Sequence, residues 1–314
     1  MPRRRCTVAD LNVKLGPLAL KNPVMTASGT FGYGEEYEDF FPVEKLGAVV
    51  VKGIAPWPSH GNPTPRVAEV TGGMLNAIGL QGPGIDAFLT GDHYLPRLKK
   101  TKATVIVNIW GKKPEDYAYV AERLEAEKDF IAALEINVSC PNVKEGGLSF
   151  GTDPKALAGV VAAVRKATTI PLITKLSPNV SRIADFALAA QDAGSDILSL
   201  INTIPAMAID VETRRPKIAN VTGGMSGPAV KPVAIKLVYE ASKAVSIPII
   251  GMGGIMNGLD AVEFLLAGAS AVAVGTAIFA DPRAPLRVIG ELDAYLDSHG
   301  IASVSELVGQ VRLD

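Results

Sequence analysis

Eight short apolar runs, spaced along almost the whole chain, constrain the fold of this sequence more than any other feature. Most of them are continuous rather than alternating in polarity, as expected of strands that are buried on both faces. They occur at residues 23–27, 48–52, 104–109, 132–138, 171–176, 196–201, 248–252 and 271–274. The runs therefore predict a parallel sheet that is covered on both sides.

Amphipathic segments lie between these runs and predict helices. Six are expected, at residues 115–127, 154–168, 182–193, 231–245, 259–267 and 282–299. Several open on helix-start signals, such as Thr152-Asp153-Pro154 and Asp281-Pro282. Eight strands alternating with helices predict an α/β fold of the (β/α)8 TIM-barrel type. Because barrels of this length commonly form one domain, we expect residues 1–314 to form a single barrel domain.

A doubly wound dinucleotide-binding fold is the alternative, and the cluster Gly251-Met252-Gly253-Gly254 tests it. The dinucleotide fingerprint requires a glycine three positions after its second glycine. In this sequence that position is Met256, and the cluster falls late in the chain instead of after the first strand. The barrel is therefore favoured.

Two connections between predicted strands are too long to be simple loops. One spans residues 54–103 and the other spans residues 204–229. Long insertions at the carboxyl end of a barrel usually cover the site that lies there. We therefore expect both insertions to cover the C-terminal face.

Composition argues against several classes of function. The 314 residues carry a formal net charge of -1, and no block of Lys and Arg is long enough to track phosphates, so nucleic acid is not expected as a partner. The longest uncharged run, residues 264–280, is short for a membrane span, and no signal peptide is recognised. A cytoplasmic protein without membrane association is expected.

The cysteines and histidines do not predict a disulfide framework or a metal site. Two cysteines, Cys6 and Cys140, are too few for a disulfide framework or an iron–sulfur cluster, and the histidines are widely scattered.

Glycine-rich turns follow the last two predicted strands, at the end of a barrel where active sites lie. They are Gly253-Gly254 and Gly275-Thr276. Glycine turns that lead into helix N-termini expose backbone N–H groups to a phosphate. Tight packing at a barrel corner would explain one such pair, but two on adjacent strands favour phosphate binding.

Lys52 and Lys175 lie at the ends of hydrophobic strands, where an unpaired ammonium group is costly. Either lysine alone could extend its ammonium group to water. Together, beside a phosphate pocket, they indicate an anionic ligand or a Schiff-base enzyme. The predicted strand ends and insertions also carry four carboxamide side chains and no catalytic carboxylate among them. The pattern therefore indicates in-plane hydrogen bonding to a heterocycle rather than hydrolysis. The carboxamides are Asn76, Asn108, Asn137 and Asn202.

The stretch Asn137-Val138-Ser139-Cys140-Pro141-Asn142 is the polar cluster most indicative of chemistry. It follows an apolar run at residues 130–136, so it falls where a core strand ends. A thiol at that position can act as a nucleophile or as a proton acceptor, and the neighbouring asparagines can hold a planar polar substrate. A buried, unreactive cysteine beside a turn is the alternative for a lone Cys.

These stretches together resemble the class 1 dihydroorotate dehydrogenases, and most closely the class 1B catalytic (FMN) subunits. The resemblance covers about residues 11–308, and its motifs are highly specific in combination. Cys140 excludes the membrane-bound class 2, which uses serine and carries an N-terminal membrane segment. The matching stretches are residues 27–29, 61–66, 75–80, 137–142, 175–178, 201–203, 224–228, 251–254 and 275–276.

The resemblance implies an FMN enzyme that oxidises (S)-dihydroorotate to orotate in pyrimidine (UMP) biosynthesis. Cys140 would remove the proton from carbon 5 while a hydride leaves carbon 6 for the flavin, and Lys175 would stabilise negative charge on the reduced flavin. The residues implied to bind substrate are Lys52, Asn76, Ala77, Ile78, Gly79, Leu80, Asn137, Asn142, Asn202 and Thr203. Those implied to bind FMN are Ser28, Lys52, Gly53, Asn108, Asn137, Lys175, Ile201, Gly227, Gly253, Gly254, Gly275 and Thr276.

The same resemblance implies a partner for electron transfer. The sequence has neither a dinucleotide fingerprint nor enough cysteines for a cluster, so reduced FMN needs an external acceptor. In class 1B relatives, a second subunit that carries FAD and a 2Fe–2S cluster passes the electrons to NAD. The two chains form a heterotetramer around a homodimer of catalytic subunits, and we expect the same arrangement here.

Several alternatives stay open. Class 1A relatives are homodimers that pass electrons to fumarate. A related flavin barrel could act on another dihydropyrimidine, such as dihydrouracil or dihydrouridine in tRNA, although the near-neutral charge weighs against tRNA and residues 75–80 favour orotate. A Schiff-base lyase on a phosphorylated sugar, with Lys175 or Lys52 as nucleophile, is a different class of enzyme. A non-catalytic barrel that binds a phosphorylated ligand is the last alternative.

Overall fold

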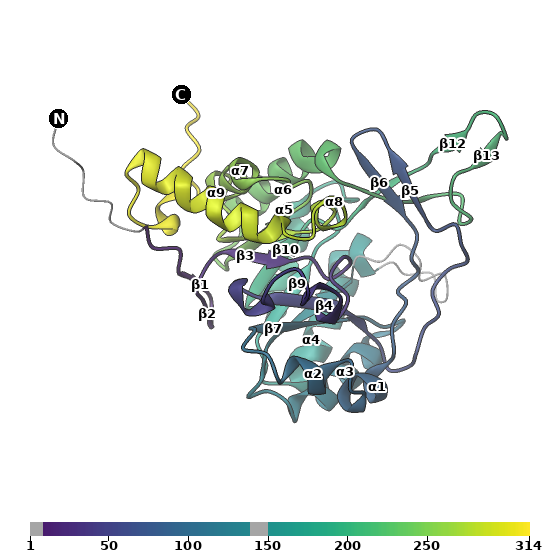
Figure 1. The fold of residues 1–314 in the computed structure, drawn as a ribbon. Helices are drawn as coiled ribbons and strands as arrows, with labels where there is room; N and C mark the ends of the chain where they lie inside the picture. The colour runs from purple at the N-terminus through teal and green to yellow at the C-terminus, as the bar shows by residue number, and fades with distance from the viewer. Residues whose placement is uncertain (1–8, 139–149) are drawn as a thin grey trace, which may run out of the picture.

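An eight-stranded parallel sheet forms the centre of the computed structural model, which describes residues 9–138 and 150–314 (Figure 1). Around the sheet the strands follow the order β3-β16-β15-β10-β9-β8-β7-β4. The strands are β3 (Val24–Thr26), β4 (Val49–Ile54), β7 (Val105–Ile109), β8 (Ile131–Asn137), β9 (Leu172–Lys175), β10 (Ile197–Leu200), β15 (Ile249–Met252) and β16 (Ala271–Val274). All eight predicted runs are strands, and their ends differ from the prediction by no more than a residue or two.

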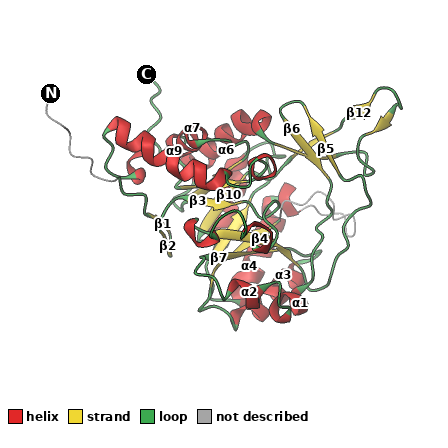
Figure 2. Cartoon of the chain, viewed as in Figure 1, coloured by secondary structure: helices red, strands yellow, loops and turns green. Residues whose placement is uncertain are grey.

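The sheet closes on itself through its two end strands. A parallel bridge between Met25 and Ala48 joins β3 to the beginning of β4. The helices lie outside the strands (Figure 2), so both faces of each strand are buried, as the apolar runs require. The predicted (β/α)8 barrel is confirmed.

Within residues 9–138 and 150–314, six long helices cover the barrel at the predicted places. They are α3 (Pro114–Glu125), α4 (Pro154–Ala167), α5 (Ile183–Asp192), α6 (Lys231–Ala244), α7 (Gly258–Leu266) and α9 (Ala284–His299). The predicted start signal of α4 is confirmed, because the Asp153 side chain accepts a hydrogen bond from the Lys155 backbone N–H at 2.8 Å. The predicted start of α9 at Pro282 is two residues early. There the N–H of Ala284 donates to the carbonyl oxygen of Asp281 and closes a turn before the helix.

The connection between β3 and β4 contains no α-helix. It holds two short 3₁₀ helices, η1 (Glu35–Tyr37) and η2 (Val43–Lys45). The ring of Tyr37 stacks on that of Phe31 at a centroid distance of 4.3 Å, and the ring of Phe41 is tilted against Phe31 at 6.2 Å. This aromatic cluster covers the barrel where a helix would otherwise lie.

The two long insertions pair with each other above the carboxyl ends of the strands. The first supplies β5 (Val67–Val70), β6 (Gly73–Asn76), α1 (Ile85–Thr90) and α2 (Leu95–Leu98). The second supplies β11 (Ile204–Ala206), β12 (Ile209–Asp210), β13 (Arg215–Pro216) and β14 (Gly223–Ser226). Antiparallel pairing gives one sheet in the order β11-β14-β6-β5, with Asn76 opposite Gly224. The predicted cover of the C-terminal face is therefore one continuous layer built from both insertions.

An N-terminal hairpin that the sequence did not predict fills the other end of the barrel. Its strands are β1 (Val13–Leu15) and β2 (Leu18–Leu20), and Leu15 and Leu20 are buried in one apolar cluster with Ile173 and Ile197 of the barrel interior. Gly16, at the turn, has a φ of +55°, and a Cβ at this position would lie 3.3 Å from the carbonyl oxygen of Asp196. The hairpin therefore seals the amino-terminal end of the barrel.

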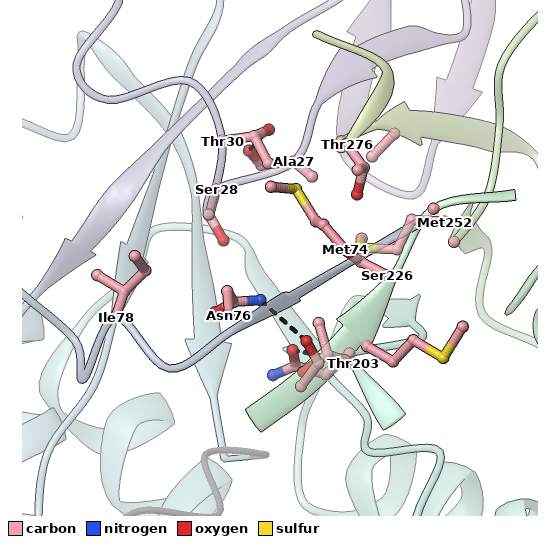
Figure 3. A pocket seen from close by; sticks show the side chains of 18 of the residues that line it. Ala27, Ser28, Thr30, Met74, Asn76, Ile78, Thr203, Ser226, Met252 and Thr276 are labelled. Atoms are coloured by element: carbon pink, nitrogen blue, oxygen red, sulfur yellow. Dashed lines mark hydrogen bonds between the residues drawn. The ribbon is translucent and has the colours of Figure 1, made fainter. Parts of the chain in front are cut away.

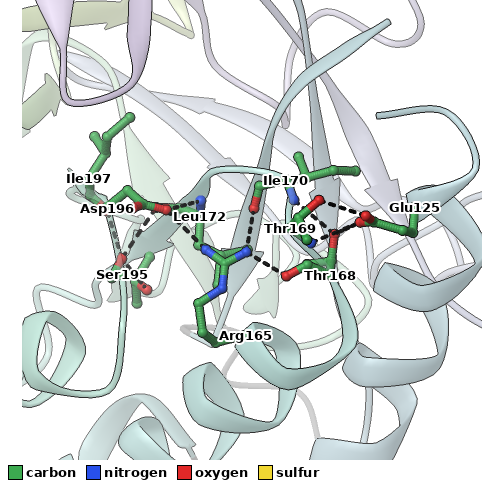
Figure 4. A network of polar contacts seen from close by, with 10 residues as sticks. Glu125, Arg165, Thr168, Thr169, Ile170, Leu172, Ser195, Asp196 and Ile197 are labelled. Atoms are coloured by element: carbon green, nitrogen blue, oxygen red, sulfur yellow. Dashed lines mark hydrogen bonds and ion pairs between the residues drawn. The ribbon is translucent and has the colours of Figure 1, made fainter. Parts of the chain in front are cut away.

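A polar network at this same end fixes the loops that enter β9 and β10 (Figure 4). Glu125, the last residue of α3, accepts hydrogen bonds from the Thr168 hydroxyl at 2.5 Å and from the Thr169 backbone N–H at 2.9 Å. Arg165 of α4 donates to Asp196 at 3.1 Å and to the carbonyl oxygen of Ile170 at 2.9 Å. Each charged group is paired with groups of another segment, so the network ties helices to strand entrances.

Candidate active site at the carboxyl end of the barrel

A cavity of about 720 Å³ lies between the carboxyl ends of the barrel strands and the sheet made by the insertions. In Figure 3, Ser28 and Thr276 come from the loops after β3 and β16, and they lie across the opening from Asn76 and Thr203. The cavity falls in the size range of small-molecule and cofactor sites. Its place matches the end of the barrel where active sites occur.

Nearly all predicted site residues line this one cavity. Cys140 and Asn142 lie outside the described residues, so the structure neither places them nor tests them. The others belong to segments that are far apart in the sequence, and the fold brings them together. They are Ser28, Lys52, Gly53, Asn76, Ala77, Ile78, Gly79, Leu80, Asn108, Asn137, Lys175, Ile201, Asn202, Thr203, Gly227, Gly253, Gly254, Gly275 and Thr276. Their roles stay predictions.

One corner of the cavity is built from backbone rather than from side chains. Gly253 and Gly254 have φ angles of +122° and +82°, which L-residues rarely adopt. A Cβ on Gly254 would lie 2.8 Å from the Cβ of Lys231 and 2.9 Å from the carbonyl oxygen of Gly227. Glycine is therefore required by both conformation and space. The chain then enters α7, and Gly275 and Thr276 lead directly into the short helix α8 (Ala277–Ala280).

The carboxamides on the opposite side of the cavity order one another. The Asn202 side-chain N–H group donates to Oδ1 of Asn137 at 3.5 Å, and the Asn202 Oδ1 accepts from the Thr203 backbone N–H at 2.8 Å. Asn76 donates to the carbonyl oxygen of Gly224 at 3.4 Å, across the β6–β14 pair. Fixed amide groups of this kind can present donors and acceptors in defined directions to a polar ring.

Lys175 differs from the prediction in one respect. Its ammonium group is buried, as expected, but it already has an anionic neighbour in the protein: Nζ lies 3.5 Å from Oε1 of Glu135. Nζ also donates to the Ser28 hydroxyl at 3.4 Å. An anionic ligand is therefore not needed to explain the position of Lys175, although the ammonium group still borders the cavity.

Lys52 shares the cavity wall with a second cation, Arg66. Burial lowers the pKa of Lys52 below the ordinary lysine value, the positive charge of Arg66 adds to this effect, and Glu36 opposes it. Both cations line the cavity. Because Arg66 disfavours the positive charge of Lys52, an anionic group bound near both cations would be stabilised electrostatically.

Two charged residues at this site are not among the predicted site residues. Arg66 closes the matched stretch 61–66, and its place in that motif is a signal that could have identified it. Glu135 is a carboxylate within an otherwise apolar run, which was the only available signal. The apolar part of the lining includes Met74, Met225, Met252 and Met256.

Among the described residues, no helix combines the length and the apolar character that a membrane crossing requires.

Residues 10–296 match the sequence model of a family described as dihydroorotate dehydrogenase.

Curated relatives match along almost their whole length. A protein of Geobacter sulfurreducens named "Dihydroorotate dehydrogenase B (NAD(+)), catalytic subunit" is 56% identical over 304 residues, which cover 97% of this chain and 99% of the relative. A protein of the same name from Geotalea daltonii is 53% identical with the same coverage. Among solved structures, a DHODH from Eimeria tenella in complex with ferulenol superposes with a TM-score of 0.79 at 27% identity. The match covers 99% of this chain and 91% of that one.

Proposed function

The chain belongs to the dihydroorotate dehydrogenase family of oxidoreductases, and on this premise we propose that it oxidises (S)-dihydroorotate to orotate with FMN as hydride acceptor. The relatives' names and the family match support oxidation of dihydroorotate. The observation that carries the proposal is the cavity itself. It combines a glycine corner suited to phosphate, a buried ammonium group and ordered carboxamides within about 720 Å³.

The residues present fit an FMN molecule on grounds of hydrogen bonding and shape. Asn108 lines the cavity, is buried, and its Nδ2 has no hydrogen-bond partner among the described residues. A buried amide without a partner is costly, so it is suited to donate to a bound ring. Gly253, Gly254, Gly275 and Thr276 would hold the phosphate through backbone N–H groups in the turn that follows β15 and in the turn that leads into α8. Bound FMN supplies a hydride acceptor.

The chain's own residues would perform the remaining tasks. Asn76, Asn137, Asn202 and Thr203 would hold the substrate ring, since their amide and hydroxyl groups line one side of the cavity. The cations Lys52 and Arg66 would favour the substrate carboxylate electrostatically. Cys140 would take the proton from carbon 5, three residues beyond the end of β8 at Asn137. Because an ordinary thiol is only a few per cent ionised at neutral pH, the reaction should speed up as the pH rises.

A spectroscopic experiment tests this proposal. The purified protein should be yellow, and anaerobic addition of dihydroorotate should bleach the flavin absorbance, while dihydrouracil should not. A colourless protein, or a flavin that dihydroorotate leaves oxidised, would contradict the proposal. Bleaching by dihydrouracil alone would favour an enzyme for another dihydropyrimidine.

We also propose the route of the electrons after FMN. The relatives are named as catalytic subunits of an NAD(+) enzyme, which implies a partner subunit for them. For this chain we propose an electron-transfer subunit with FAD and a 2Fe–2S cluster, joined in a heterotetramer around a homodimer.

The acceptor specificity of the isolated chain distinguishes this route from the class 1A route. Alone, the chain should reduce artificial dyes with dihydroorotate but should reduce NAD poorly, and co-expression with the partner should restore NAD reduction. Rapid fumarate reduction by the isolated chain, with no gain from a partner, would show that it works as class 1A enzymes do.

A further inference from the structure

A buried carboxylate lies beside the cavity without lining it. Glu135 of β8 is only 2% exposed, and its Oε1 is 3.5 Å from Nζ of Lys175, which does line the cavity. Within the described part of the chain, this oxygen has no hydrogen-bond partner. A buried carboxylate oxygen that lacks a hydrogen bond is unfavourable for stability. Its place next to a cavity-lining ammonium group therefore points to a role in the chemistry of the cavity.

Strand register shows that this pair belongs to a polar layer across the barrel interior. Glu135 lies opposite Asn108 in the β7–β8 ladder, and Lys175 lies opposite Ser199 in the β9–β10 ladder. Asn108 and Ser199 are each 1% exposed, and neither Asn108 Nδ2 nor Ser199 Oγ has a hydrogen-bond partner among the described residues. The side chains of this layer are almost inaccessible to solvent, and some of their polar atoms lack hydrogen-bond partners, so charge within the layer is weakly screened.

The charges around the pair are few. Ser28, Asn108 and Ser199 are uncharged, and they occupy the neighbouring positions after β3, on β7 and on β10. Lys52 on β4 and Arg66 in the insertion are the cations that line the same cavity in the described structure. In that part of the chain, Glu135 is therefore the carboxylate that forms an ion pair with the Lys175 ammonium group.

We propose that Glu135 is a positioning residue that holds the Lys175 ammonium group at the cavity floor and offsets its positive charge, which lowers the reduction potential of the flavin bound there. The inference rests on the proposed function, because it requires FMN in this cavity. Reduction adds negative charge to the flavin, and an uncompensated cation nearby would favour the reduced state. The carboxylate reduces that effect, since opposite charges 3.5 Å apart largely cancel at a distance.

The flavin midpoint potential of Glu135→Gln tests the proposal, because glutamine keeps the size of the side chain and removes its charge. We expect the ratio of reduced to oxidised flavin at a fixed ambient potential to rise about tenfold, which is about 30 mV for a two-electron couple. Lys175→Met should shift the potential in the opposite direction. The double variant should match Lys175→Met, since a buried carboxylate without its cation does not keep its charge.

A matched control separates this effect from a general change of charge. Glu125→Gln makes the same substitution at the other end of the barrel and should leave the potential unchanged. If Glu135→Gln does not accumulate as folded protein, Glu135→Asp retracts the charge by one methylene and should shift the potential in the same direction by a smaller amount.

The outcomes distinguish this inference from the proposed function. A wild-type protein that binds no FMN would overturn the proposed function. A wild-type protein that binds FMN, combined with a Glu135→Gln potential that is unchanged or more negative, would overturn only the role of Glu135. In the fallback variant Glu135→Asp, a wild-type potential would overturn that role equally.

Discussion

At the amino-terminal end of the barrel, the charged groups of Glu125, Arg165 and Asp196 are each paired, and the Leu15 side chain fills the interior. At the carboxyl end of the same strands, buried polar atoms of Asn108, Glu135 and Ser199 have no hydrogen-bond partner among the described residues. The same eight strands therefore support two different kinds of environment. Satisfied polar groups and apolar packing stabilise the fold, whereas the unpaired amide group of Asn108, which lines the cavity, is available to a ligand.

This contrast predicts that the two ends respond differently to substitution. Changes at the carboxyl end should alter flavin chemistry or binding with little effect on folding. Changes at the amino-terminal end should alter stability and leave the chemistry of the folded protein intact. Four substitutions, taken from the largest expected effect to the smallest, test this separation.

Cys140→Ala should slow flavin reduction by dihydroorotate by about 10²–10⁴-fold, which is the usual contribution of a positioned general base. FMN should stay bound, because the residues proposed to hold its phosphate, such as Gly253 and Gly254, are unchanged. Stopped-flow measurement of flavin bleaching gives the rate. Cys140→Ser should keep part of the activity, shifted to higher pH because an alcohol ionises less readily than a thiol. Bleaching of the alanine variant at the wild-type rate would show that Cys140 is not the base.

Leu15→Ala should reduce the free energy of unfolding by about 2–5 kcal/mol, because it removes a fully buried side chain from the apolar seal. Flavin reduction by the folded fraction should keep the wild-type rate. Urea unfolding and stopped-flow kinetics measure the two quantities. The neighbouring substitution Lys14→Ala, at an exposed position, is the control and should change neither. A large loss of rate in folded Leu15→Ala protein would contradict the separation of the two ends.

Gly254→Ala should weaken FMN binding about tenfold. A positive φ disfavours an L-residue by roughly 1–2 kcal/mol, and the new Cβ would also contact Lys231 and the Gly227 carbonyl oxygen closely. Fluorescence titration of the apoprotein with FMN measures the dissociation constant. Gly290→Ala is the matched control, since a Cβ on that helical glycine meets nothing within 4 Å. Equal FMN affinity in the two variants would exclude this corner as the phosphate site.

Glu125→Gln should lower stability at neutral pH by about 1–2 kcal/mol, near the low end of the range for hydrogen bonds to a charged group, because the Glu125 side chain is 26% exposed. Hydrogen bonds from Thr168 and Thr169 lower the pKa of Glu125 to about 2. Because the folded-state pKa is depressed, this stabilisation is complete above the ordinary value of 4.5 and is lost as the pH falls towards 2.

Chemical unfolding of both proteins between pH 7 and pH 3 measures this effect. The difference in stability between wild type and Glu125→Gln should shrink as the pH falls through that window. A difference that stays constant with pH would indicate that the glutamate contributes through packing rather than through its charge. The rate of flavin reduction should be the same in both proteins.

The sequence by itself determined the barrel and the strand ends. A strand that is buried on both faces must be apolar along its whole length, so runs such as 104–109 and 248–252 mark it locally. The side chains that follow each strand then share one face, because the fold is parallel. For this reason Asn108, Lys175 and Gly253 could be assigned to one site before their positions were known.

Only the tertiary structure decided which distant segments meet. The pairing of β6 with β14 joins residues about 150 positions apart, and no local pattern in either segment specifies the other. The hairpin under the barrel was missed because its strands have three residues each, too few for a periodic signal. The contact between Glu135 and Lys175 likewise depends on two neighbouring strands in register. Periodicity records which face of an element is buried, whereas the partner of a buried charge is fixed only when separate elements pack together.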